Sequence, residues 1–140
     1  MKRVVFDKAL LFICAFMLTA AISGCSSISS KNNYLRPADF ARHLNNEGVR
    51  VESVRPLAPE PLSAGEAVEL KIGNSWIGVY KYDINHRDQR RRLEMIDRSK
   101  RVYFNGIPYP IYEVSGSFIV VGLDKNKEKR RILKALRSFN

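Results

Sequence analysis

Cysteine is scarce in this chain of 140 residues, and both copies, Cys14 and Cys25, lie near its start. Residues 26–140 contain none, so this part of the chain cannot form a disulfide, hold a metal through thiolates or use a cysteine nucleophile. We therefore expect its stability to come from a hydrophobic core alone.

The sequence also lacks the motifs of common catalytic and metal sites. His43 and His86 are the only histidines, and neither lies in an HxH or HExxH pattern. The stretch Ser115-Gly116-Ser117 has no GxSxG context and no histidine after it, so we interpret it as a turn. The glycines are too dispersed for a phosphate-binding loop. We expect no catalytic residue, no metal and no cofactor, and therefore do not expect an enzyme.

Acidic residues are outnumbered, with 14 Asp and Glu against 24 Lys and Arg, and from Cys25 onward the net charge is 21 − 13 = +8. Such a surplus favours polyanionic partners through long-range, salt-sensitive attraction. Two segments, 87–101 and 125–137, are especially basic, and the alternative is that both are simply solvated helix faces. The arginines that we single out as a candidate anion-binding surface are Arg87, Arg90, Arg91, Arg92, Arg98, Arg130 and Arg131.

The apolar run near the start of the chain, residues 9–18, is shorter than the about 20 residues that a membrane-spanning helix needs. It follows Lys2, Arg3 and Lys8, and a positive segment before a short apolar segment is typical of a secretory signal peptide. The sequence Ile22-Ser23-Gly24-Cys25 comes next. These features, in this order, resemble the signal peptide and lipobox of bacterial lipoproteins.

The resemblance implies a processing step and an address. Ile22, Ser23 and Gly24 would be recognised by the signal peptidase, which would cleave before Cys25. Diacylglycerol and a further acyl chain on Cys25 would then anchor the protein permanently to a membrane. Ser26 stands where an Asp would favour the inner membrane of enteric-type bacteria, so we expect the periplasmic face of the outer membrane. The alternative is the outer leaflet of the inner or sole cytoplasmic membrane.

The chain is therefore expected to have three parts. Residues 1–24 are the removed signal peptide. Residues 25–33 comprise the lipidated cysteine and a flexible tether, because Ser26 to Asn33 is polar and has little to bury. Residues 34–140 have the size of a single small periplasmic domain.

Apolar spacing of the helical kind is present in three segments of that domain, and Asp83 or Asn85 is expected to cap the second helix and Asn126 the third. The predicted helices span 37–48, 83–100 and 127–139. Alternation of apolar and polar residues, or a buried β-rich run, predicts the strands. They are placed at 49–54, in a hairpin of 67–72 and 76–82, in a hairpin around Asn105-Gly106, and at 118–121.

This order of elements predicts an α+β fold, with one mainly antiparallel sheet and about three helices packed mostly on one face. Together with the lipobox and the charge, it predicts a lipid-anchored cell-envelope lipoprotein that acts as a non-enzymatic binding module. The expected partner is an anionic lipid, a glycolipid, a cell-wall polymer or an envelope protein. Nucleic acid is not expected, because an exported protein rarely meets it. Two alternatives stay open: an envelope enzyme with an unrecognised site, and a tethered DNA-capturing protein.

Overall fold

The structure is a computed structural model, and it describes residues 27–140. The predicted signal peptide, the lipobox residues 22–24 and Cys25 lie outside the described residues.

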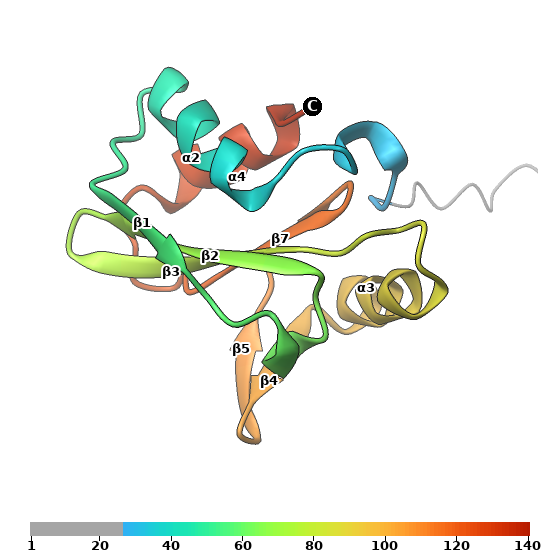
Figure 1. Cartoon of the computed structure of the whole chain (residues 1–140). Coiled ribbons are helices and arrows are strands. Elements are labelled where there is room, and N and C mark those ends of the chain that lie inside the picture. The colour runs from blue at the N-terminus through green and yellow to red at the C-terminus, as the bar shows by residue number, and fades with distance from the viewer. Residues whose placement is uncertain (1–26) are drawn as a thin grey trace, which may run out of the picture.

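A five-stranded antiparallel sheet, in the order β1-β2-β3-β7-β6, forms the middle layer of the fold (Figure 1). Its strands are β1 (Ser53–Pro56), β2 (Glu66–Ile72), β3 (Ser75–Lys81), β6 (Val114–Ser115) and β7 (Phe118–Val121). A separate hairpin is formed by β4 (Arg101–Phe104) and β5 (Ile107–Pro110). Together with the helices, this arrangement confirms the predicted α+β class.

Both predicted hairpins form where turn residues allow the chain to reverse. Gly73 has a φ of 59° between β2 and β3, and a Cβ at this position would meet open space. Asn105 and Gly106 both have positive φ, at 48° and 79°, as a tight two-residue hairpin turn requires. Local turn chemistry was thus a sound guide to these pairings.

The helices are α2 (Pro37–Asn46), α3 (Arg87–Ser99) and α4 (Lys129–Ser138), with short 3₁₀ turns η1 (Ser30–Asn32) and η2 (Glu60–Leu62). Helices α2 and α4 cover one face of the sheet, whereas α3 and the β4–β5 hairpin lie on the other (Figure 1). Successive residues of β7 point to opposite faces of the sheet. Phe118 packs into the core beneath α2 and α4, and Ile119 packs into the core beneath α3. Two of the three helices therefore share a face, in line with the prediction.

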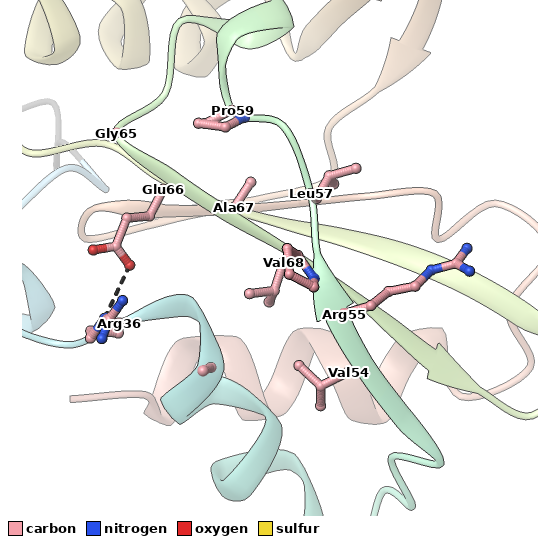
Figure 2. Close-up of a pocket in the computed structure, with 11 residues that line it drawn as sticks. Arg36, Val54, Arg55, Leu57, Pro59, Gly65, Glu66, Ala67 and Val68 are labelled. Atoms are coloured by element: carbon pink, nitrogen blue, oxygen red, sulfur yellow. Dashed lines mark hydrogen bonds and ion pairs between the residues drawn. The ribbon is translucent and has the colours of Figure 1, made fainter.

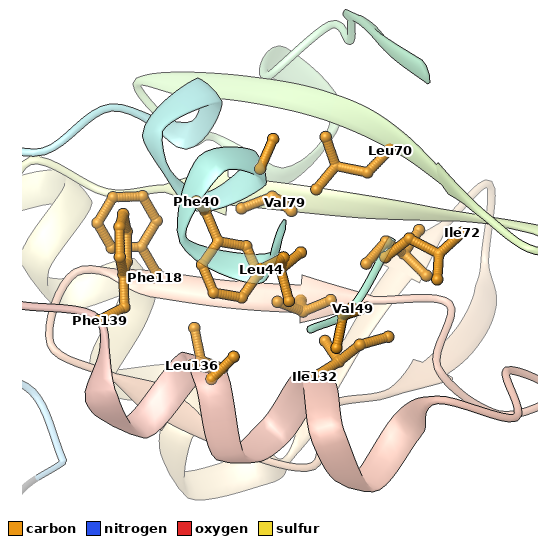
Figure 3. Packing of buried hydrophobic residues seen from close by; sticks show 14 of the residues in the cluster. Phe40, Leu44, Val49, Leu70, Ile72, Val79, Phe118, Ile132, Leu136 and Phe139 are labelled. Carbon is orange, nitrogen blue, oxygen red and sulfur yellow. The ribbon is translucent and has the colours of Figure 1, made fainter. Parts of the chain in front are cut away.

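The core under α2 and α4 is built from aliphatic and phenylalanine side chains (Figure 3). Leu44 of α2 and Leu136 of α4 are fully buried there, as are strand residues from the middle of the sheet. The ring of Phe139 lies 5.1 Å from that of Phe40 and 5.2 Å from that of Phe118, both in edge-on geometry. These contacts hold the end of α4 against α2 and the sheet.

The core under α3 is more polar in composition. Leu93 and Ile96 of α3 pack beside Tyr80 and Tyr82, and all four are buried. The hydroxyl of Tyr82 donates a hydrogen bond to the backbone carbonyl of Leu62, at 3.0 Å. This bond satisfies the one polar atom that the Tyr82 ring brings into the interior.

Three elements begin later in the chain than the sequence predicts. The strand expected at 49–54 begins only at Ser53, because Val49 is instead buried in the core of α2 and α4. Helix α3 begins at Arg87 after His86, and the Asp83 carboxylate accepts the Asn85 N–H in the preceding turn. Helix α4 begins at Lys129, since the Asn126 side chain closes a turn onto the Glu128 N–H.

Candidate anion-binding surface

Helix α3 presents arginine on the side that faces away from the sheet. Its apolar residues Leu93 and Ile96 are buried on one side, and residues four and seven positions apart share a face of a helix. Arg87, Arg91 and Arg98 follow this spacing and are exposed. Because α3 buries Leu93 and Ile96 against the sheet, these arginines lie on its solvent-exposed face.

Three arginines of α3 lack an acidic partner in the described part of the chain. Among the described residues, no carboxylate lies within 4.0 Å of the guanidinium groups of Arg87, Arg90 or Arg91. Arg90 uses Nε to donate to the Ile84 carbonyl at 2.7 Å. Together with Glu94, the three arginines line a shallow depression of about 460 Å³. We call Arg87, Arg90 and Arg91 the arginine surface.

Other cations of the same segment are paired. Arg98 Nη2 lies 4.0 Å from Glu94 Oε2, and Lys100 is hydrogen-bonded to Asp97. Arg92 differs again, because its Nε is buried and has no hydrogen-bond partner within the described chain. Burial raises the pKa of the neighbouring Tyr82, and the Arg92 charge opposes that rise. Arg92 is therefore placed toward the core and outside the arginine surface.

The two predicted arginines of α4 are on the other face of the sheet from α3. Arg131 is engaged, since Nη1 lies 2.8 Å from Glu128 Oε2 and Nη2 donates to the Gly48 carbonyl at 2.6 Å. Arg130 is exposed. The seven predicted arginines therefore do not form one continuous surface, because the sheet separates the two groups.

The segment expected to be a flexible tether is partly built into the domain, which corrects that prediction for residues 27–33. The buried side chain of Asn32 donates to the carbonyls of Ser115 (3.2 Å) and Phe139 (3.0 Å) and accepts from the Ser117 N–H (2.9 Å). The Ser27 carbonyl accepts the Gly116 N–H at 2.9 Å. We call residues 27–33 the strut.

A glycine makes room for the strut at the turn between β6 and β7. Gly116 has a φ of 61°, and a Cβ there would lie 2.1 Å from the Asn32 Oδ1 atom. A larger residue would therefore both strain the backbone and push Asn32 out of its site. The sequence signal for this contact was weak, because a buried asparagine inside a Ser- and Asn-rich stretch has no apolar pattern.

The strut is also joined to the start of α3. Asn33 Oδ1 accepts from the Ile84 N–H at 3.1 Å, and Asn33 Nδ2 donates to Asp83 Oδ1 at 2.9 Å. This bond from Asn33, and a second one from the Asn85 backbone, lower the pKa of Asp83 below its usual value. Because Arg90 binds the Ile84 carbonyl, the arginine surface begins beside the strut.

A second hollow, of about 450 Å³, lies along the edge strand β1, between β2 and the start of α2 (Figure 2). Arg36 and Glu66 face each other across it, with Nε and Oε2 3.3 Å apart. The other guanidinium at its rim, that of Arg55, pairs with Glu69 at 2.7 Å and lies 3.7 Å from the centre of the Trp76 ring. Since both arginines are already partnered, this groove is a weaker candidate for binding anions than the arginine surface.

Both histidines have structural surroundings. His43 Nε2 lies 3.0 Å from the Ala135 carbonyl and 3.0 Å from the Ser138 hydroxyl, and thus links α2 to α4. His86 is exposed and lies 3.5 Å from the Asp83 carboxylate. Residues 27–140 contain no group of three or more His, Cys, Asp or Glu side chains placed to hold a metal.

No protein-family model matches the chain, and searches of curated proteins and of solved structures find no match either. Within the described part of the chain, none of the helices has the length and apolar character needed to cross a bilayer.

Proposed function

We propose that this protein is a lipid-anchored binding module of the bacterial cell envelope, without catalytic activity. Cys25 carries the lipid, and the arginine surface of α3 binds an anionic component of the envelope. The observation that carries the proposal is the group of three neighbouring exposed arginines with no carboxylate within 4.0 Å in the described chain.

Arginine is suited to this role because its planar guanidinium can donate two parallel hydrogen bonds to a phosphate or a carboxylate. Where a protein carboxylate is close, as for Arg131 or Arg137, those donors are already used. At the arginine surface most of them face solvent. An incoming phosphate or carboxylate therefore gains interactions without first breaking an ion pair.

The address of the protein is part of the proposal. Ser26 supports the outer membrane of an enteric-type host, with the domain on the periplasmic side, and the outer leaflet of the cytoplasmic membrane is the alternative. In either place, candidate anions are phospholipid headgroups, phosphorylated glycolipids and the carboxylates of wall polymers.

The first test is acylation of Cys25. In cells given labelled palmitate, the wild-type chain should be labelled and shortened, whereas Cys25→Ala should remain an unlabelled precursor. The matched control is Cys14→Ala, which removes the other cysteine and should be processed and labelled like the wild type. Entry of label into Cys25→Ala would show that the assigned attachment point is wrong.

The second test addresses the arginine surface. We expect the detergent-solubilised protein to be retained on immobilised polyphosphate and to be released by salt, because exposed charges are screened. The triple variant Arg87→Gln, Arg90→Gln, Arg91→Gln should elute at markedly lower salt than the matched triple variant Lys125→Gln, Arg130→Gln, Lys134→Gln. Equal elution of the two variants would contradict the assignment to α3, and competition by DNA but not by polyglutamate would favour a DNA-capturing protein.

A further inference from the structure

The strut fixes where the lipid is attached relative to the folded domain. Cys25 lies two positions before Ser27, so their Cα atoms can be at most about 7 Å apart. The Ser27 carbonyl is bound to Gly116, and Asn32 is buried between the β6–β7 turn and the end of α4. A lipid on Cys25 would therefore hold this end of the domain at the membrane surface, where a long flexible linker would not.

The same end of the domain carries the arginine surface. Asn33 of the strut accepts a hydrogen bond from the Ile84 N–H, and Arg90 donates one to the Ile84 carbonyl. Ile84 alone therefore bridges the strut and Arg90. On α3, Arg87 lies three residues before Arg90 and Arg91 one residue after it, and all three line the same depression. These guanidinium groups thus lie within reach of whatever surface holds the lipid.

The free cations of α4 lie at the opposite end. Its C-terminal end touches the strut, because the Arg137 carbonyl accepts from Lys31 Nζ at 3.1 Å and the Phe139 carbonyl accepts from Asn32. A helix of ten residues is about 15 Å long, so Lys127, before its first residue, lies about that far from the strut. The anchor brings the start of α3, and not the start of α4, to the membrane.

We propose that the arginine surface docks onto anionic phospholipid headgroups of the membrane that holds the lipid anchor, with the strut setting the orientation of the domain. This inference rests on the proposed function and names the partner of its binding surface. Charge complementarity supports it, since each Lys or Arg near an anionic bilayer contributes about 1 kcal/mol. Removing three arginines should then lower the equilibrium constant for docking on the order of a hundredfold.

The test uses single cysteines, because residues 26–140 contain none. A fluorophore is placed at Asp88→Cys, on α3, or at Lys127→Cys, before α4, in the mature lipoprotein. Mass spectrometry first establishes that Cys25 is acylated. The protein is then reconstituted into vesicles of phosphatidylcholine alone or mixed with phosphatidylglycerol, both containing lipids with a nitroxide quencher in the headgroup.

We expect strong quenching at position 88 and weak quenching at position 127 in the phosphatidylglycerol vesicles. The difference should be reduced by salt and be smaller in phosphatidylcholine, where only the strut orients the domain. The triple variant of Arg87, Arg90 and Arg91 to Gln should reduce the difference to the value seen in phosphatidylcholine. The triple variant of Lys125, Arg130 and Lys134 to Gln should keep it. Equal quenching at the two positions, or loss of the difference in the α4 variant, would overturn the inference.

A third variant tests the strut by inserting a flexible Gly-Ser linker between Ser26 and Ser27. Quenching at position 88 should fall, because the orientation is no longer imposed by the anchor. Unchanged quenching would overturn the role of the strut. A protein without acyl groups would instead refute the proposed function, so the two failures are distinguishable.

Discussion

Helices α3 and α4 belong to basic segments of equal cation number that differ in how they contact the strut. The α3 segment, 87–101, and the α4 segment, 125–137, each contain seven Lys and Arg residues. The strut, however, contacts the turn that leads into the first helix and the C-terminal end of the second. The unpaired arginines of α3 thus lie beside the strut, to which the proposed anchor would be joined, whereas Lys125 and Lys127 lie at the far end of α4.

This comparison teaches that charge counting does not locate a binding surface. Both segments have the same cation number, and α4 has fewer acidic residues, so composition alone would favour α4. What separates them is the direction in which each helix runs from the strut. Two neighbouring asparagines hold the strut against both helices. The side chain of Asn32 is bound to the C-terminal end of α4, and that of Asn33 is bound to the turn before α3.

The largest effect that we predict is at Asn32. Asn32→Ala should lower the free energy of unfolding by about 3 kcal/mol, because the Ser117 N–H and the carbonyls of Ser115 and Phe139 would be left buried without their partner. Asn33→Ala should cost less, about 1 kcal/mol, since its bonds are only partly buried. Urea unfolding of the detergent-solubilised protein measures both.

A control variant separates loss of the buried asparagine from loss of any asparagine. Asn45→Ala removes a bond of similar length to the Val51 N–H, at 2.9 Å, but at an exposed site, and should change stability least of the three. In addition, trypsin should cleave after Lys31 faster in Asn32→Ala than in Asn45→Ala. Equal stability of Asn32→Ala and Asn45→Ala would mean that the strut is held by something other than Asn32.

Much of the fold could be predicted because its signals are local. The period-two pattern of Val68, Leu70 and Ile72 gave β2, and the core under α2 and α4 contains Leu70 and Ile72 with Val68 packed against it. The helical spacing of Ile132, Leu136 and Phe139 predicted the buried face of α4. Each of these patterns arises because one face of a single helix or strand is buried against the core.

The candidate site was harder to predict, because it depends on contacts between distant parts of the chain. Asn32 and Ser117 are 85 positions apart, and no local pattern in a polar stretch indicates that one residue in it will be buried. The choice of sheet face for α3 and α4 likewise depends on strand order. The sequence therefore singles out the seven arginines but does not show which of them share a surface.

The two cores beneath these helices also differ in chemistry. The core under α2 and α4 contains three phenylalanines and no tyrosine among its buried residues, whereas Tyr80 and Tyr82 are buried beneath α3. Burial raises the pKa of Tyr80 to about 12 and raises that of Tyr82 as well. Alkaline conditions should therefore weaken the α3 side of the molecule first.

The sign follows from the unfolded chain, in which tyrosine has its ordinary pKa of 10. Above that pH the unfolded chain loses the proton while the buried Tyr82 keeps it, so stability falls as pH rises, by about 1.4 kcal/mol at about pH 11. Tyr82→Phe should lower the free energy of unfolding by about 1 kcal/mol at neutral pH, because the bond to Leu62 is lost. Between neutral pH and about pH 11, however, this variant should lose about 1.4 kcal/mol less stability than the wild type. Denaturant titrations at both pH values measure this, with Tyr34→Phe, an exposed ring, as the control. An identical alkaline loss in Tyr82→Phe and Tyr34→Phe would show that the α3 core is not where the sensitivity lies.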